Sequence, residues 1–460
     1  MMTQTTHRSI RMRCAQMTLL WVIAAWISTD AFAEEPLHLS FWDESDVLDT
    51  AGARIDFGAN VLRADGIASG YPDMWFGCEV PRDDESAWIY GWRMLPAQDG
   101  AERTIEVLRA YTSDGRTFAG EETVFSLEDA GWQGFANVVY RPIDGSIFLF
   151  SYSAARLRVF RSEDGITWQN LTDEAYVNHD AMNVTWYPPW GEFLNYQNTL
   201  EPYPKRYPDN IGEHRRVFSF LRSTDGVNWD DYSPEFLNGE SRWRPDDEDP
   251  VDLEFYRGIV FPTEGRYAML LQDYIAPPPE ANSRRGSTKH GPRSLVEWAI
   301  SRDGLNWSRP HRDLDVSEQV GSLPVQGPLT RDGKHLFYQR NGAISALDAG
   351  RLFFVTSLGN GEFSTVPFHM PATGLTLNVD ASYPANQGDT GRAYVMAELQ
   401  NEHSQTLPGY ERTHTIIEDI DNKAFPLSWN GKTGSELAGR TVRLRFSLRD
   451  AKLYAVSAAE

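Results

Sequence analysis

Cysteine is nearly absent from this sequence, which holds two cysteines in 460 residues, Cys14 and Cys78. A framework of disulfides is therefore excluded, and a large buried core has to stabilise the folded chain. Basic residues are also scarce, with 43 Lys and Arg against 65 Asp and Glu. A net charge of −22 repels nucleic acid and anionic membranes, so we expect neither as a partner.

Long apolar runs are missing as well, apart from Met17–Ile27 near the N-terminus. Three arginines precede this run, and an Ala-Phe-Ala sequence that ends at Ala33 follows it. This order is typical of a secretory signal peptide, and the run is too short to span a bilayer. We therefore predict a signal peptide over 1–33 and export to the periplasm or the extracellular space. Removing it leaves a net charge of −24 and a single cysteine, Cys78.

One short polar turn recurs four times, in TSDGRTF, RSEDGITW, RSTDGVNW and SRDGLNW, with its aspartate at 114, 164, 225 and 303. Asp-Gly suits a tight turn, because Gly supplies positive φ and the Asp carboxylate accepts nearby backbone N–H bonds. The aromatic residue three positions after the Gly can pack between adjacent sheets. The recurrence indicates that these turns, called DG boxes below, are scaffolding and do not carry the chemistry.

The spacing of the DG boxes predicts a β-propeller. Intervals of 50, 61 and 78 residues lie near or above the length of a four-stranded blade. Alternating strands precede each copy, and long amphipathic helical stretches are absent after the signal peptide. We predict an all-β protein with a five-bladed propeller over 36–372, whose first unit begins at ANVLRADG. Six blades stay open as an alternative, because the first unit is long and irregular.

The strand rhythm changes at TGLTLNVDA, which begins at Thr373. Short alternating strands separated by Gly, Pro and Asn loops follow it. We therefore predict a small C-terminal β-sandwich over 373–460.

Taken together, the DG boxes, HDAMNVTWYPPWGEFLNY, DPVDLEFY and GRTVRLRFSLRDAKLYAV resemble the secreted five-bladed propeller glycoside hydrolases. The resemblance is to proteins related to the glycoside hydrolase family 32 N-terminal domain and to the family 43 type. It implies a hydrolase that cleaves glycosidic bonds in poly- or oligosaccharides. The Asn-Asp-Pro-Asn nucleophile motif of invertases is missing, so fructosidase activity does not carry over. Adjacent Asp and Gly in the boxes favour this group over sialidases.

Candidate catalytic residues follow from the position of the innermost strands, which line the funnel of a propeller. We expect these strands to begin near 56–60, 135–137, 180–183, 252–256 and 326–328. Glycoside hydrolysis needs one carboxyl group to protonate the leaving oxygen and a second to activate water or attack carbon. Related propeller hydrolases take three acids from different blades, and Asp56, Asp180 and Asp252 or Glu254 match them by strand position. The predicted catalytic residues are Asp180, Asp252 and Glu254.

Glu254 is the predicted proton donor. Two residues apart on one strand, Asp252 and Glu254 share a face, and their repulsion raises the pKa of one of them. Asp252 would position the donor or the sugar, and Asp180 would be the base. Neutralisation of both acids by arginines such as Arg242 or Arg244 is the alternative. The predicted substrate-binding residues are Asp56, His179, Asn183, Asp249 and Tyr256.

Two other functions stay open at this point. The chain could be a carbohydrate-binding propeller without turnover, or a six-bladed propeller of the sialidase type. We expect no cofactor, although DDEDPVDLE could hold a structural calcium ion through its carboxylates. A carbohydrate is the expected partner, and the chain is expected to be a monomer.

Overall fold

The computed structural model describes residues 37–459, apart from 53–54, 83–85, 97–102, 129–134, 154–155, 174–180, 206–210, 232–241, 276–293, 313, 315, 317–322, 325 and 383–391. The predicted signal peptide lies outside the described residues. Strands dominate the described part, and its helices are three short 3-10 turns: η1 (Glu44–Asp46), η2 (Arg412–His414) and η3 (Ser435–Leu437). No helix in this part is long and apolar enough to cross a membrane. The predicted all-β class is confirmed.

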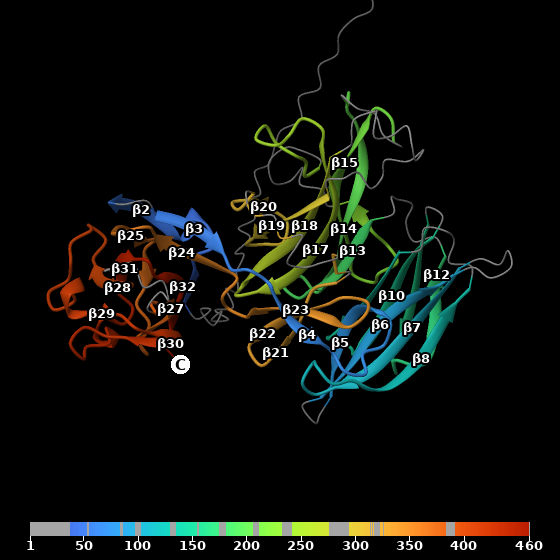
Figure 1. Cartoon of the computed structure of the whole chain (residues 1–460), viewed down its shortest axis with the longest axis horizontal. Coiled ribbons are helices and arrows are strands. Elements are labelled where there is room, and N and C mark those ends of the chain that lie inside the picture. The colour runs from blue at the N-terminus through green and yellow to red at the C-terminus, as the bar shows by residue number, and fades with distance from the viewer. Residues whose placement is uncertain are drawn as a thin grey trace, which may run out of the picture. The chain divides into compact units, whose positions relative to one another are not determined.

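Five four-stranded antiparallel sheets form the propeller, and Figure 1 shows them around a common centre. Blade 1 contains β5 (Trp75–Pro81), β6 (Ala87–Leu95), β7 (Thr104–Thr112) and β8 (Ala119–Leu127). Blade 2 contains β9 (Phe135–Arg141), β10 (Ser146–Ser153), β11 (Arg156–Ser162) and β12 (Trp168–Thr172). Blade 3 contains β13 (Met182–Tyr187), β14 (Glu192–Pro202), β15 (His214–Ser223) and β16 (Asp230–Asp231). Blade 4 contains β17 (Leu253–Thr263), β18 (Arg266–Ile275), β19 (Ser294–Ser301) and β20 (Trp307–Ser308).

Blade 5 is built from two distant parts of the chain. It contains β21 (Leu329–Arg331), β22 (Lys334–Tyr338), β23 (Ala343–Asp348) and β4 (Arg63–Ile67). β4 pairs with β23 through Ala343 opposite Ile67 and Ser345 opposite Ala64. The prediction that ANVLRADG opens the first blade was therefore wrong. This strand supplies the last strand of the fifth blade, because pairing its two ends is how the chain closes the ring.

Each of the five interfaces between neighbouring blades has its own cluster of buried apolar side chains. The clusters join blades 1 and 2, 2 and 3, 3 and 4, 4 and 5, and 5 and 1. The last of them includes Leu336 and Tyr338 of blade 5 with Ile89 and Leu108 of blade 1. The ring is thus closed by packing as well as by strand pairing. No sixth four-stranded sheet of this kind is present among the described residues.

The DG boxes are the connections between the third and fourth strands of blades 1 to 4, and they lock each blade onto the one before it. In blade 4, Asp303 Oδ1 accepts hydrogen bonds from the backbone N–H groups of Leu305 (2.9 Å) and Asn306 (2.7 Å). These bonds outweigh the effect of partial burial and lower the pKa of Asp303. Tyr196 of blade 3 donates a hydrogen bond to the carbonyl of Gly304, at 2.8 Å.

The aromatic residue of each box packs on the preceding blade, as predicted. Trp168 lies 5.6 Å from Phe125, Trp229 lies 5.8 Å from Phe150, and Trp307 lies 5.9 Å from Tyr196, measured between ring centroids. Phe118 of blade 1 packs in the same way on Tyr338 of blade 5, at 5.8 Å. The expected scaffolding role of the boxes is confirmed.

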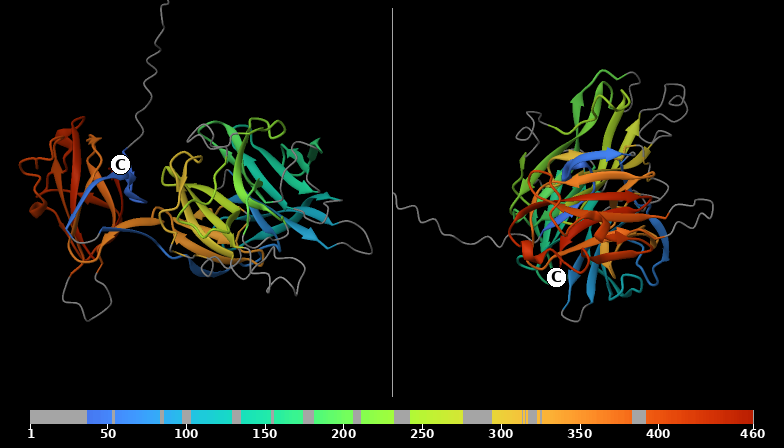
Figure 2. Two further views of the ribbon diagram at one scale, coloured as in Figure 1. Left: turned by 90° about the horizontal axis from the view of Figure 1, so that it is seen from above. Right: turned by 90° about the vertical axis from the view of Figure 1, so that its left-hand side faces the viewer.

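The sandwich combines both ends of the described chain. One sheet contains β1 (His38–Ser40), β3 (Ile55–Ala59), β24 (Phe353–Ser357), β27 (Leu375–Asp380), β30 (Asp421–Leu427) and β32 (Lys452–Ala458). The other contains β2 (Val47–Gly52), β25 (Gly361–Thr365), β26 (Phe368–His369), β28 (Tyr394–Gln400), β29 (Ile416–Ile417) and β31 (Thr441–Arg449). Both views of Figure 2 show the blue N-terminal strands among the orange and red C-terminal ones.

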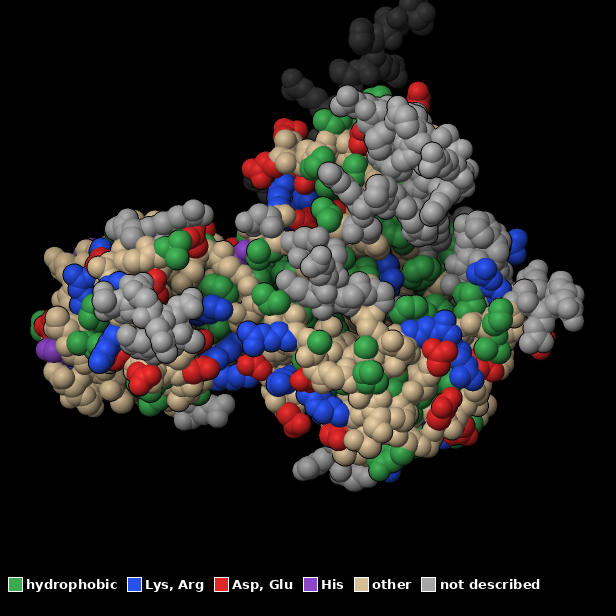
Figure 3. All heavy atoms as spheres, viewed as in Figure 1, with side chains coloured by type: hydrophobic (Ala, Val, Ile, Leu, Met, Phe, Trp, Pro, Cys, Tyr) green, Lys and Arg blue, Asp and Glu red, His purple; other side chains and the backbone are tan. Residues whose placement is uncertain are grey.

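The predicted boundary at Thr373 was therefore wrong, and so was the assignment of 36–59 to the propeller. β3 pairs with β24 from Phe353 opposite Ala59 to Ser357 opposite Ile55. Phe41, Val355 and Phe363 lie in one hydrophobic core with the later strands. These early strands carry apolar side chains that only the C-terminal strands bury. On the face drawn in Figure 3, basic and acidic side chains are interspersed.

The tight fit of a DG box predicts a large cost for a methyl group at its glycine. Gly304 has φ +75°, and an added Cβ would lie 2.9 Å from Tyr187 Cε2. Gly265 has φ +70° with open space around it. We expect Gly265→Ala to cost about 1–2 kcal/mol of unfolding free energy from backbone strain alone. Gly304→Ala should cost about 1–3 kcal/mol more, because its methyl group is also overpacked. Urea unfolding measures both, and equal losses would contradict the docking role.

The interleaved sandwich predicts that the chain cannot be cut at 372. A chain that ends there keeps Phe41, Val355 and Phe363 but loses the strands that bury them. We expect it to be insoluble, or to bind a hydrophobic dye and unfold without a cooperative transition. A chain that starts at 34 is the control and should unfold like the full-length protein. Cooperative unfolding of the 372-residue chain at the full-length temperature would refute the interleaved arrangement.

Candidate functional site

The innermost strands surround a cavity of about 320 Å³ on the propeller axis. All five blades contribute to its lining, through residues of β5, β9, β13 and β17 and the segment that leads into β21. Examples are Phe76, Val138, Trp186, Phe261 and Pro328. Its lining is mostly apolar and lies toward the carboxyl ends of β9, β13 and β17. The predicted site lies at the opposite mouth, where these strands begin.

A network of buried amides separates the axial cavity from that mouth. Asn183 Nδ2 donates to Gln326 Oε1 at 2.7 Å, and Asn183 Oδ1 accepts from the backbone N–H of Val260 at 3.0 Å. Gln326 Nε2 in turn donates to the carbonyl of Val184 at 3.1 Å. Asn183 therefore ties together blades 3, 4 and 5. Both polar atoms of its buried side chain already have protein partners, which argues against the predicted contact with a sugar.

Glu254 lies near the start of β17, where the sequence predicted an innermost strand. Its carboxylate is completely buried and contacts two cations. Lys205 Nζ bonds to Oε1, and Arg216 bonds to Oε2 through its guanidinium at 2.7 Å and its backbone N–H at 3.1 Å. Both carboxylate oxygens are therefore occupied by donors of the protein itself. This surrounding is that of a charge anchor and argues against the predicted proton donor.

The alternative of a neutralised acid holds for Glu254, but through other cations than the expected ones. Arg242 instead donates to Thr199 Oγ1 at 2.9 Å, and Arg244 lies 3.6 Å from Glu201. Lys205 and Arg216 come from the long hairpin of blade 3, far along the chain from Glu254, so no sequence pattern links them to it. The strand spacing therefore predicted the position of Glu254 but not its partners.

Asp252 does not share the strand with Glu254. It lies in the turn before β17, where the backbone N–H of Leu253 bonds to the carbonyl of Pro250 at 2.9 Å. The expected same-face pair of acids on one strand is therefore absent. Asp249, predicted to bind substrate, instead forms a buried ion pair with Arg309.

The remaining predicted binding residues have different placements. Tyr256 lies at an irregular position in the β17–β18 pairing, and its carbonyl accepts a bond from Asn198 Nδ2 at 3.0 Å. Asp56 lies on β3 of the sandwich, opposite Thr356, and not at the start of a blade, so its expected place was wrong. Asp180 and His179 lie outside the described residues.

A second buried acid pair was not predicted. Asp273 and Glu297 lie on neighbouring strands β18 and β19 and interact with each other. Burial raises the pKa of both groups, and the charge of Glu297 adds to this for Asp273. Arg309 donates to Glu297 Oε1 at 2.7 Å. Strand register, which the sequence does not reveal, brings the two acids together.

This pair cannot work with Glu254 on one substrate. Asp273 lies opposite Phe255 in the β17–β18 ladder, whereas Glu254 lies opposite Tyr274. Neighbouring residues of a strand point to opposite faces of the sheet, so the two acidic groups are separated by the blade. Glu254 therefore shares no face of the sheet with Asp273.

Arg257 is the most unusual group near this mouth. Its buried guanidinium donates to the carbonyl of Pro324 at 2.6 Å and lies 5.0 Å from the ring centroid of Phe135. Its Nε has no hydrogen-bond partner, and no carboxylate among the described residues pairs with it. Burial lowers the pKa of Arg257 to about 10. A buried cation of this kind is costly unless something else satisfies it.

Several other buried polar atoms of blades 2 and 3 also lack hydrogen-bond partners among the described residues. They are Asn137 Nδ2, Asn195 Oδ1, Gln197 Nε2 and Asn198 Oδ1. Buried polar atoms are normally satisfied, so such a group marks a place for water or a polar ligand. Donors and acceptors are both present, as hydroxyl groups require.

The expected calcium site finds no support among the described residues. No three metal-ligating side chains gather there. Within DDEDPVDLE, Asp246 bonds to Arg312 through both oxygens, at 2.6 Å for one of them, and Asp249 pairs with Arg309. Arginines therefore neutralise the carboxylates that calcium would need.

No protein-family model matches the sequence, and no curated protein matches it. A thermostable family-43 glycoside hydrolase aligns with 10% identity and a TM-score of 0.37, over 62% of this chain and 91% of that chain. The Bombyx mori GH32 β-fructofuranosidase aligns with 8% identity and a TM-score of 0.38, over 87% and 94%. A GH130-family structure aligns with 14% identity and a TM-score of 0.37, over 66% and 96%. Likenesses this low assign neither an activity nor residue roles.

The surroundings of Glu254 predict that it matters for folding. Glu254→Gln would leave Lys205 and Arg216 buried without a counter-charge, so we expect a loss of about 3–5 kcal/mol of unfolding free energy. Adding Lys205→Met should recover part of this loss. Glu163→Gln, at a side chain that is 78% exposed, is the control and should change stability by less than about 0.5 kcal/mol. An unchanged unfolding curve for Glu254→Gln would contradict the anchor role.

Proposed function

We propose that this chain is a carbohydrate-active propeller that binds poly- or oligosaccharides at the mouth where β9, β13 and β17 begin, and hydrolyses their O-glycosidic bonds there. The observation that carries the proposal is the group of buried amide donors and acceptors on blades 2 and 3 that have no partner among the described residues, together with Arg257 of blade 4. A sugar presents many hydroxyl groups, each of which can donate and accept. Export by the segment 1–33 belongs to the same proposal.

In this proposal each residue has a separate task. Glu254, bonded to Lys205 and Arg216, fixes the position of the blade 3 hairpin over β17. Asp252 and Asp180 are the acids left for proton transfer, and Asp180 is the proposed base. Arg257 supplies a donor that no described carboxylate occupies.

A non-catalytic sugar-binding propeller is the second candidate. The ion pairs of Glu254 favour it, because Lys205 and Arg216 occupy both oxygens of the predicted proton donor. The two candidates share the binding site and differ only in turnover.

Turnover of a panel of arabinan, fructan, xylan, mannan and pectic oligosaccharides separates the two candidates. We expect release of reducing ends from one substrate class, and a fall in kcat of at least about 10²-fold in Asp180→Asn. Glu163→Gln, at an exposed turn, should keep the wild-type rate.

Binding is measured on the same panel by calorimetry. Binding without release would contradict hydrolysis and support the second candidate. Neither binding nor release across the panel would contradict the carbohydrate proposal as a whole.

A further inference from the structure

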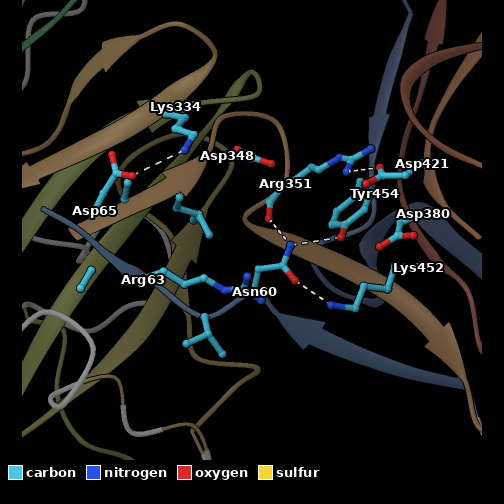
Figure 4. A pocket seen from close by; sticks show the side chains of 14 residues that line it. Asn60, Arg63, Asp65, Lys334, Asp348, Arg351, Asp380, Asp421, Lys452 and Tyr454 are labelled. Carbon is cyan, nitrogen blue, oxygen red and sulfur yellow. Dashed lines mark hydrogen bonds and ion pairs between the residues drawn. The ribbon is translucent and has the colours of Figure 1, made fainter. Parts of the chain in front are cut away.

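A second cavity, of about 480 Å³, lies between strands of blade 5 and strands of the sandwich. β4, β22 and β23 contribute to one side, and β27, β30 and β32 to the other. Figure 4 shows its charged side chains around the opening. Its volume is that of a site for a small molecule, which spans roughly 300–1,000 Å³.

Asn60 holds one wall of this cavity in place. Its Nδ2 donates to the carbonyl of Arg351 at 2.8 Å and to the Tyr454 hydroxyl at 3.1 Å. Its Oδ1 accepts from Lys452 Nζ at 2.8 Å. The Lys452 stem also lies against Phe354, with Nζ 4.3 Å from the ring centroid. The ammonium of Lys452 is thus fixed at the cavity wall by a neutral partner.

The lining charges are only partly paired. Arg351 pairs with Asp421 at 2.5 Å, and Lys334 lies 3.7 Å from Asp65. Among the described residues, no ion pair within 4.0 Å is found for the other four charged groups. These are Arg63, Lys452, Asp348 and Asp380.

The two cations with no ion pair lie close enough to repel. Burial lowers the pKa of Lys452, and the charges of Arg63 and Arg351 lower it further, while Asp380 opposes them. Three cations therefore line this cavity with a single ion pair among them, and an anion bound there would relieve the repulsion. One oxygen of Asp380, Oδ1, accepts a hydrogen bond from the backbone N–H of Ser382 at 3.1 Å.

Asp348 and Asp380 give the same cavity two acceptors. An anion alone would be repelled by them, whereas a ligand with hydroxyl groups could donate to both. A sugar acid has a carboxylate and several hydroxyls on one small ring. It therefore fits the mixture of unpaired cations and unpaired carboxylates better than a simple anion or a neutral sugar.

We propose that this cavity binds one acidic sugar unit, with its carboxylate between Arg63 and Lys452 and its hydroxyls donating to Asp348 and Asp380. That the ligand is a sugar rests on the proposed function, whereas that it carries a negative charge is argued from the cavity alone. The site would hold an acidic residue of a saccharide away from the funnel.

Calorimetry with galacturonate, galactose and acetate tests the proposal on the full chain. Galactose keeps the ring and lacks the carboxylate, and acetate keeps the carboxylate and lacks the ring. We expect galacturonate to bind at least about tenfold more tightly than either, and more weakly as salt is raised. The double variant Arg63→Gln/Lys452→Met should lose at least about tenfold in affinity, and Lys452→Arg should keep most of it.

Arg340→Gln is the control variant, because Arg340 pairs with Asp73 and does not line the cavity. It should bind galacturonate as the wild type does, and thermal unfolding should show all variants folded. Equal binding of galactose or of acetate, no binding of galacturonate, or unchanged binding by the double variant would each overturn the proposal.

Binding and turnover of the saccharide panel distinguish a failure of this inference from a failure of the proposed function. If no saccharide is bound or cleaved there while galacturonate binds in a Lys452-dependent way, the proposed function fails and this inference stands. If the double variant loses galacturonate but keeps wild-type turnover of the panel, both stand.

Discussion

The pairing of β4 with β23 is the contact on which the rest of this structure depends. It joins residues near the start of the described chain to residues almost 280 positions later, through pairs such as Ala343 with Ile67. A ring of sheets leaves only short, protected strand edges once its last blade is completed, and each blade then packs against a neighbour on both faces. Joining such distant segments costs conformational entropy. Burial of the apolar cluster between blades 5 and 1 offsets this cost.

Closing the ring also explains why the two ends of the chain share a sandwich. The segment before β4 has to leave the propeller where the segment after β23 leaves it. β3 and β24, which flank these exits, pair along their whole length. Asn60, just before β4, bonds to Arg351, Tyr454 and Lys452 at this junction. The charged cavity is a consequence of the same junction, because two polar surfaces meet there without filling the space between them.

At the funnel, burial decides what the acidic residues can do. Glu254 has Lys205 and Arg216 on its two oxygens, whereas Asp273 and Glu297 share a buried face near the guanidinium of Arg309 and have raised pKa values. The same residue types therefore have different surroundings within one blade. Arg257 differs from these acids, because its buried guanidinium has no carboxylate partner among the described residues.

The sequence by itself determined the all-β class, the propeller and the role of the DG boxes. These features are local: an Asp-Gly turn, an aromatic three residues later and a period-2 strand pattern are all readable within about ten residues. The starts of β9 and β17 were predicted for the same reason. Only the tertiary structure decided where the first and last strands belong, since pairing between β4 and β23, or β3 and β24, leaves no local mark. It also decided the partners of Glu254 and the place of Asp56, because the charge state of a buried acid depends on side chains that the fold brings from other blades.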